Sequence, residues 1–119
     1  MYDVRADTDK NRLYVVIEGY LTDPEVLDLI KDGKAGIDQL QPGFDVINDG
    51  RNYKPFSRKG TEYIVELLNY EIEHGRNRHV RIVDKVTLGE MQFERVTKDF
   101  DVAMLVVSSL EEAEKLLDE

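Results

Sequence analysis

A run of basic side chains is the feature of this sequence with the clearest chemistry. The segment from Arg51 to Lys59 holds four cations and no acidic residue, in a chain whose formal net charge is -9. It follows a short apolar segment that ends at Asn48-Asp49-Gly50 and precedes an amphipathic stretch that ends at Gly75. We therefore expect a strand, a basic loop and a helix. Free N–H groups and the dipole at a helix N-terminus favour anions, so nearby cations would strengthen an anion site.

The candidate binding residues of this region carry charge or hydrogen-bonding groups: Asp49, Arg51, Tyr53, Lys54, Ser57, Arg58 and Lys59. Aromatic and arginine side chains are common at interfaces, so Tyr53 favours a contact surface. Phe56 either belongs to that surface or packs into the core. The other interpretation of the run is a solvated loop whose charges offset neighbouring acids. Asp49 is either a binding residue or, with Asn48 and Gly50, a turn residue.

Ser57 has two interpretations, an N-cap and a phosphorylation site. A serine immediately before a helix accepts a hydrogen bond from a backbone N–H of the first turn. This role accounts for the serine without a further assumption, and we favour it; Thr61 is the alternative cap.

Metal and catalytic motifs are absent from the sequence. The acidic spacing Asp7-x-Asp9-x-Asn11 is typical of a calcium loop, but Arg12 stands where the sharp bend needs glycine. The only histidines, His74 and His79, have no convergent partners in the pattern, and the chain has no cysteine. We predict no catalytic residues, no metal site, no cofactor and no enzymatic activity.

Composition sets the class of protein. A chain of 119 residues, 41% hydrophobic and 34% charged, predicts one globular domain over residues 1–119. The net charge of -9 disfavours nucleic acid and anionic membranes as partners. No apolar run approaches the roughly 18 residues of a membrane span. The first ten residues contain no apolar leader, so we expect a cytoplasmic protein.

Hydrophobic periodicity predicts the order β-β-α-β-α-β-α-β-α. The strands are expected near 2–5, 13–21, 44–47, 79–83 and 102–107. The helices begin after N-cap residues that we place at Thr22, Ser57 or Thr61, Thr87 and Ser109. A short turn makes the first two strands an antiparallel hairpin, and strands joined by helices run parallel. The fold class is α/β, with a mixed, mostly parallel five-stranded sheet and four helices.

Finer expectations concern the helices. Gly33 and Gly36 each lower helix stability by about 1 kcal/mol relative to alanine, so the first helix is expected to kink or end early. The apolar face of the second helix comprises Ile64, Leu67, Leu68 and Ile72.

The third helix and the last strand carry further expectations. The side chains expected to point inward from the third helix are Met91, Val96 and Phe100. Met91 and Phe93 lie on opposite sides, which indicates either a homodimer contact or a well-covered helix. The apolar strand at 102–107 predicts burial on both faces.

Four short segments follow one another in a characteristic order: Asn11-Arg12-Leu13-Tyr14 leading to Gly19, Leu40 to Val46 leading to Asp49, Gly75-Arg76-Asn77-Arg78, and Ser109 to Ala113. Together they resemble the STAS family of sulphate transporters and anti-sigma-factor antagonists, and more closely its SpoIIAA-like branch of small stand-alone proteins. The resemblance implies a SpoIIAA-like fold and a non-enzymatic, regulatory protein–protein interaction. Some relatives resemble lipid-binding folds, so the alternative is an anionic or amphiphilic small ligand, a lipid or nucleotide, at the same loop.

The resemblance also bears on Ser57. In the sporulation antagonists, a serine after an aspartate at the start of the second helix is phosphorylated by a partner kinase, which abolishes binding to that kinase. Ser57 lies near this place. Phe56 stands where the aspartate would be, and Arg58 and Lys59 replace a glycine and small apolar residues.

Overall fold

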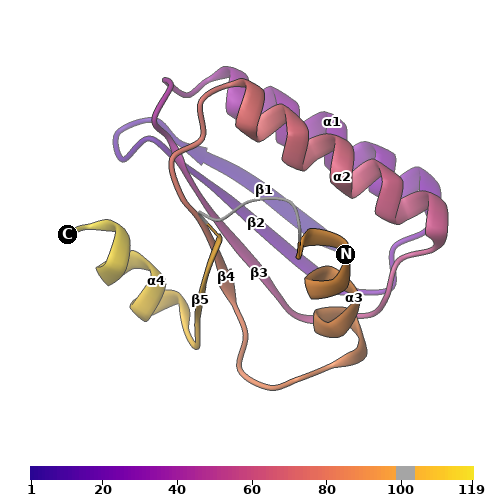
Figure 1. Cartoon of the computed structure of the whole chain (residues 1–119). Coiled ribbons are helices and arrows are strands. Elements are labelled where there is room, and N and C mark those ends of the chain that lie inside the picture. Colours follow the sequence, from indigo (N-terminus) through magenta and orange to yellow (C-terminus); the bar gives the residue numbers. More distant parts are fainter. Residues whose placement is uncertain (99–103) are drawn as a thin grey trace.

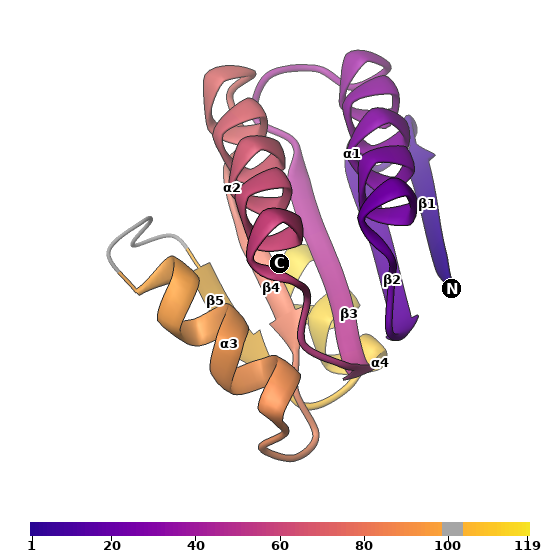
Figure 2. The ribbon, with the colours of Figure 1, turned by 90° about the vertical axis from the view of Figure 1, so that its right-hand side faces the viewer.

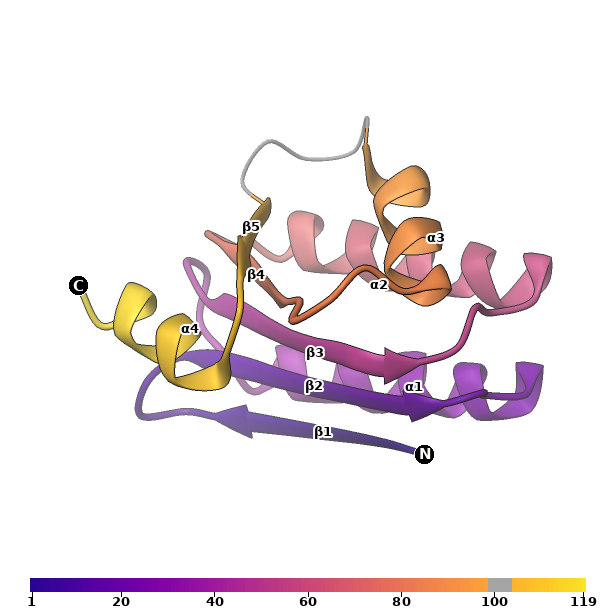
Figure 3. The same cartoon turned by 90° about the horizontal axis from the view of Figure 1, so that it is seen from below.

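The computed structural model describes residues 1–98 and 104–119, and its centre is a five-stranded sheet with the order β1-β2-β3-β4-β5 (Figures 1 and 3). The strands are β1 Tyr2–Asp7, β2 Arg12–Gly19, β3 Asp45–Tyr53, β4 His79–Ile82 and β5 Met104–Val107. β1 pairs with β2 in the antiparallel sense, and the other neighbours are parallel. The predicted mixed, mostly parallel sheet is confirmed.

Helices cover the two faces of the sheet unequally. The helices are α1 Asp23–Asp38, α2 Arg58–Glu73, α3 Leu88–Thr97 and α4 Leu110–Leu117. Figure 2 shows α1, α2 and α3 on one face, with α4 behind the sheet. The main core lies between the sheet and α1–α2, around Leu13, Val46 and Leu67. A smaller core lies under α4, around Ile47, Val80 and Leu117.

Each helix begins at a predicted cap. The N-caps are Thr22, Ser57, Thr87 and Ser109, and the side chain of each accepts a backbone N–H three residues on. Only Thr22 and Glu25 complete the reciprocal capping box. The carboxylate of Glu90 pairs instead with Arg81, and that of Glu112 reaches Ser108.

The predicted kink or early end of the first helix at Gly33 and Gly36 is wrong, since α1 is continuous from Asp23 to Asp38. A Cβ on Gly33 would lie 2.9 Å from the side chain of Leu67, and one on Gly36 would lie 2.7 Å from that of Leu13. The missing side chains let α1 approach α2 and β2 closely. Close packing therefore offsets the loss of helix propensity.

β3 is longer than predicted. Its ladder with β2 continues past Gly50, where Asn52 lies opposite Glu18 and Tyr53 opposite Gly19. The first three residues of the expected basic loop, Arg51 to Tyr53, are therefore part of a strand. The continued pairing satisfies their backbone groups better than an early turn would.

Two predicted inward-facing residues are exposed. Ile72 is 43% exposed, and the neighbouring Glu71 is buried in its place. Met91 is 54% exposed, whereas Phe93 on the opposite side of α3 is buried. In α2 the predicted residues Ile64, Leu67 and Leu68 are buried and only Ile72 differs, whereas in α3 the buried face is rotated toward Phe93. A homodimer through the Met91 side stays a prediction.

The predicted burial of the last strand on both faces is wrong for its described part. β5 is the edge of the sheet, and Val106 is 56% exposed. Leu105 and Val107 face α4 and pack in the smaller core. Residues 102 and 103, and the predicted inward position of Phe100, lie outside the described residues.

Gly89, in the first turn of α3, gives a test of how this helix is docked. A Cβ there would lie 2.6 Å from the carbonyl oxygen of Tyr53 and 3.2 Å from its ring. We expect Gly89→Ala to lower the free energy of unfolding by about 1–2 kcal/mol, because overpacking outweighs the gain in helix propensity. Urea unfolding measures this, with Glu94→Ala on the exposed side of α3 as the control. A stabilised Gly89→Ala protein would contradict the close approach.

Candidate functional site

An open groove lies where β3 and β4 end and the chain enters α2 and α3. Its volume is about 390 Å³, and its lining includes three cationic side chains: Arg51, Lys54 and Lys85. Pro55 and Leu88 contribute apolar surface. Leu88 is 73% exposed and the adjacent Val86 78% exposed. The groove therefore combines positive charge with exposed apolar side chains at the carboxyl ends of parallel strands, where α/β proteins commonly bind ligands.

The charge of Arg51 is largely offset by Asp49. Nε of Arg51 lies 2.9 Å from Oδ1 of Asp49, and Nη2 lies 2.8 Å from Oδ2. The hydrogen bonds from Arg51 hold the pKa of Asp49 below its usual range, against the effect of partial burial. Lys54 and Lys85 are exposed, and neither forms an ion pair within residues 1–98 and 104–119. The net positive charge of the groove comes mainly from these two lysines.

Tyr53 and Phe56 are core residues. Tyr53 is 6% exposed; its hydroxyl donates to the carbonyl of Gly89, and its ring stacks on Phe56 with centroids 5.1 Å apart. Burial raises the pKa of Tyr53. The side chain of Gln92 holds the backbone of Phe56 at both its N–H and its carbonyl, at 2.8 and 2.9 Å. The aromatic pair forms the wall between groove and core; Tyr53 still lines the groove, and its role in binding stays a prediction.

Ser57 caps α2 and also bonds to α1. Its Oγ accepts the N–H of Gly60 at 2.9 Å and donates to a carboxylate oxygen of Asp23. A carboxylate therefore already lies at the N-terminus of α2, where the sequence suggested an anion site. Arg58 and Lys59 are exposed in the first turn, and neither lines the groove. The predicted cations divide between the groove and the start of α2.

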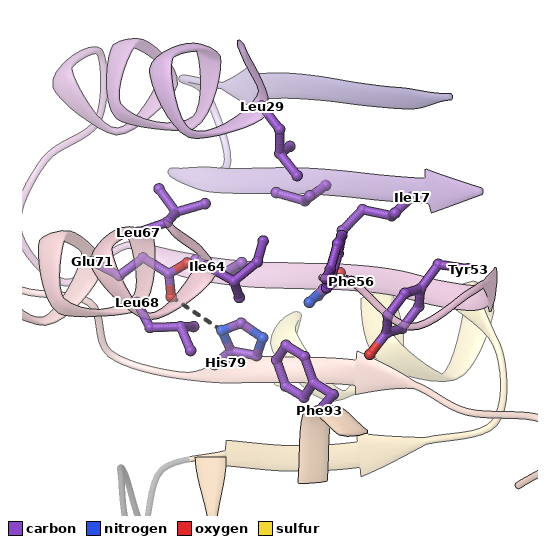
Figure 4. A pocket seen from close by; sticks show the side chains of 13 residues that line it. Ile17, Leu29, Tyr53, Phe56, Ile64, Leu67, Leu68, Glu71, His79 and Phe93 are labelled. Carbon is purple, nitrogen blue, oxygen red and sulfur yellow. Dashed lines mark hydrogen bonds and ion pairs between the residues drawn. The ribbon is translucent and has the colours of Figure 1, made fainter. Parts of the chain in front are cut away.

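The structure contains a buried ionisable cluster that the sequence did not predict. Oε1 of Glu71 lies 2.9 Å from Nη1 of Arg76 and 3.1 Å from Nδ1 of His79 (dashed in Figure 4). The three side chains are each at most 2% exposed. The cluster joins the last turn of α2 to the start of β4. In the sequence, Glu71 and Arg76 stand on either side of the helix end near Gly75. Neither hydrophobic periodicity nor motif spacing indicates that such a pair is buried.

Other classes of site find no support in the described part of the chain. No helix there is long and apolar enough to cross a bilayer. No group of three or more histidine, cysteine, aspartate or glutamate side chains among those residues is arranged to hold a metal ion.

Comparison with solved structures identifies the fold. An uncharacterized DUF3478-family protein with a SpoIIAA-like fold from Shewanella loihica PV-4 superposes with a TM-score of 0.71 at 13% identity, covering 98% of this chain and 92% of that one. Phosphorylated SpoIIAA, a Bacillus cell fate determinant, gives 0.66 at 13% identity and covers 98% and 99%. An anti-sigma factor antagonist from Mycobacterium paratuberculosis gives 0.63 at 11% identity and covers 100% and 96%. The chain has a STAS-type, SpoIIAA-like fold.

Sequence comparison does not add a closer assignment. No protein-family model matches the chain, and no curated protein matches it. At 11–13% identity the solved structures establish the fold alone.

The Ser57–Asp23 contact predicts how a negative charge at this cap would act. Aspartate is as good an N-cap as serine, but at position 57 it would face the Asp23 carboxylate. We expect Ser57→Asp to lower the free energy of unfolding by about 1–2 kcal/mol, through the lost hydrogen bond and like-charge repulsion. In a protein that already carries Asp23→Asn, the Ser57→Asp substitution should lower the free energy of unfolding much less, because the opposing carboxylate is gone. Denaturant midpoints decide this, and a Ser57→Asp protein as stable as the parent would refute the repulsion.

The Glu71 cluster predicts a large effect from a nearly isosteric change. Glu71→Gln removes the carboxylate that neutralises buried Arg76 and accepts the His79 N–H. We expect the free energy of unfolding to fall by about 3 kcal/mol, as for other broken buried ion pairs. Glu73→Gln, on the same turn but exposed, is the matched control and should change it by less than about 0.5 kcal/mol. Equal effects of the two substitutions would show that the cluster is not stabilising.

Proposed function

We propose that this protein is a non-enzymatic regulatory domain that binds an acidic segment of a partner protein in the groove formed by Arg51, Lys54, Lys85 and Leu88. The carrying observation is the local positive charge of the groove on a chain of net charge -9. Electrostatic complementarity of this kind contributes more to specificity and association rate than to affinity. The overall negative charge of the protein repels acidic molecules that lack a match to this surface.

The apolar side chains of the groove supply the contacts that charge alone does not. Leu88 is 73% exposed and lines the groove together with Lys54 and Lys85. An acidic segment with one bulky apolar side chain would cover Leu88 and place its carboxylates near Lys54 and Lys85. Interfaces commonly combine an apolar anchor with a polar rim in this way.

The likeness in fold supports a regulatory role. One of the similar structures is an anti-sigma factor antagonist and another is a cell fate determinant. By analogy of fold we assign this chain a regulatory interaction as a single cytoplasmic domain over residues 1–119. Arg58 and Lys59, exposed at the start of α2, extend the cationic surface along the chain.

A second candidate function is the binding of an anionic amphiphile, such as a lipid or nucleotide, in the same groove. The observation in its favour is the groove volume of about 390 Å³, which falls in the range of small-molecule sites. The lysines would hold the anionic group, and Leu88 and Pro55 would contact the apolar part.

A peptide selection tests the proposed function directly. Peptides displayed on phage and selected on the immobilised protein should be enriched in Asp and Glu around one bulky apolar residue. Lys54→Glu with Lys85→Glu should weaken the dissociation constant of the best peptide at least tenfold by calorimetry, because attraction becomes repulsion. Lys31→Glu with Lys115→Glu, the same change in net charge elsewhere, is the control.

Three results would count against acidic-segment binding. These are selected peptides without acidic residues, equal loss of binding in both double variants, and no enrichment at all. If no peptide binds, but anionic lipids or nucleotides bind and the double variant Lys54→Glu with Lys85→Glu weakens that binding, the second candidate replaces the first.

A further inference from the structure

β1 forms one edge of the sheet, and no strand of the described part of the chain pairs with its outer side. Figures 2 and 3 show it as the outermost strand, with α1 lying over the face of the sheet rather than beyond the edge. Its pairing with β2 runs without a bulge from Tyr2 to Asp7, and the strand contains no proline and no lysine. Natural sheet edges are often blunted by such features, because an open edge can pair with another strand. The β1 edge is therefore suited to strand addition.

The hydrogen bonds of β1 determine which of its backbone groups face outward. Met1 exchanges two backbone hydrogen bonds with Glu18, at 2.9 and 2.8 Å. Such residues alternate along an antiparallel pair, so Asp3 and Arg5 also direct their N–H and C=O groups toward β2. The backbone groups that point outward belong to the alternate residues Tyr2, Val4 and Ala6.

The side chains of β1 alternate between the two faces of the sheet. Those of the three outward residues turn toward α1 and pack against the main core. The side chains of Asp3 and Arg5 are exposed on the other face. Among the described residues, Arg5 reaches only the carboxylate of Asp7, at 3.9 Å, and its guanidinium lies over the ring of Tyr14. An acid and a base thus stand two residues apart on one face of an open edge.

A second copy of β1 fits this edge in one antiparallel register, with Val4 opposite Val4 of the second copy. The outward backbone groups of the two Val4 residues then meet across a two-fold axis, and those of Tyr2 meet those of Ala6. Asp3 lies directly opposite Arg5 of the second copy, and by symmetry Arg5 lies opposite its Asp3. These are non-hydrogen-bonded positions of the ladder, where facing side chains come closest.

The neighbouring registers place like charges opposite each other. Moving the axis by one residue toward the N-terminus sets Asp3 opposite Asp3, and moving it toward the C-terminus sets Arg5 opposite Arg5. Both shifts still pair outward backbone groups, but like charges directly opposite each other destabilise a strand pair. The charges of β1 therefore select one register. A two-fold contact of this kind closes as a dimer and adds no further copies.

We propose that the β1 edge is a homodimer interface through which two copies of this chain join their sheets into one continuous sheet. The occupant is a second copy because Asp3 and Arg5 supply both halves of the ion pair, so the strand is complementary to itself. The edge is held in shape by α1, since the Tyr2 hydroxyl donates to Asp32 at 2.6 Å. The interface is separate from the Met91 side of α3. No groove-lining residue comes from β1, so the dimer leaves both grooves open and does not depend on the proposed function.

Charge reversal tests the register. Asp3→Arg places cations opposite cations, and Arg5→Asp places acids opposite acids. Each single variant should therefore dimerise at least about tenfold more weakly than the parent protein, by sedimentation equilibrium. An equimolar mixture of the two variants should dimerise again, because every facing pair becomes attractive. Asp9→Arg, in the exposed turn after β1, makes the same charge change as Asp3→Arg and should leave the dissociation constant of the dimer unchanged.

Hydrogen exchange of the parent protein locates the interface. The outward N–H groups of Val4 and Ala6 should become protected as the protein concentration rises, because pairing with the second copy bonds them. The N–H groups of Asp3 and Arg5 are directed toward β2 and should not change with concentration. This measurement needs no variant, so it decides even if a substitution unfolds the protein.

Three results would overturn the proposal. The first is a parent protein that sediments as a monomer at every soluble concentration. The second is a dimer without concentration-dependent protection at Val4 and Ala6, which would place the contact elsewhere. The third is an equimolar mixture of the Asp3→Arg and Arg5→Asp variants that associates no more tightly than either variant alone.

Discussion

The Glu71 carboxylate, shared by Arg76 and His79 in the protein interior, is the interaction on which the arrangement of α2 and the central strands depends. It joins the last turn of α2 to the first residue of β4, and β4 lies beside β3. Burying charged groups is unfavourable unless each is paired, so α2 cannot slide or rotate without separating them. The same constraint turns Ile72 to the surface and leaves Nε2 of His79 directed into the core.

The opposite end of α2 is held by hydrogen bonds rather than by ion pairs. Ser57 bonds to Asp23 of α1, and Gln92 of α3 holds the backbone of Phe56. Gly89 lets α3 approach the end of β3 so closely that the Tyr53 hydroxyl reaches its carbonyl. These contacts fold the β3–α2 connection inward as a wall of two aromatic rings. The groove lies outside that wall, and Tyr53 lines the groove as well as packing in the main core.

A shared fold does not by itself imply a shared binding site. Solved structures at 11–13% identity share the architecture along nearly the whole chain. An architecture can be kept by any sequence with the right apolar pattern and caps, whereas a site depends on individual side chains. Here Phe56, in the connection between β3 and α2, is part of the core. The Lys54–Lys85 groove depends on the individual side chains of this sequence, and the shared fold alone does not imply it.

The sequence by itself determined the order of the elements, three of the four caps and the antiparallel start of an otherwise parallel sheet; for the second helix it left Ser57 and Thr61 as alternatives. These follow from interactions between residues close in the chain, which periodicity and capping chemistry report directly. It also located the basic segment between the third strand and the second helix, but it missed that Arg51 to Tyr53 continue the strand and did not show which cations would meet. Tertiary structure decided that Lys85 from another connection joins Lys54 and that Tyr53 is buried. It likewise brought Glu71, Arg76 and His79 together. Each of these outcomes depends on which strands are neighbours and on how closely helices approach them, and no local pattern encodes those distances.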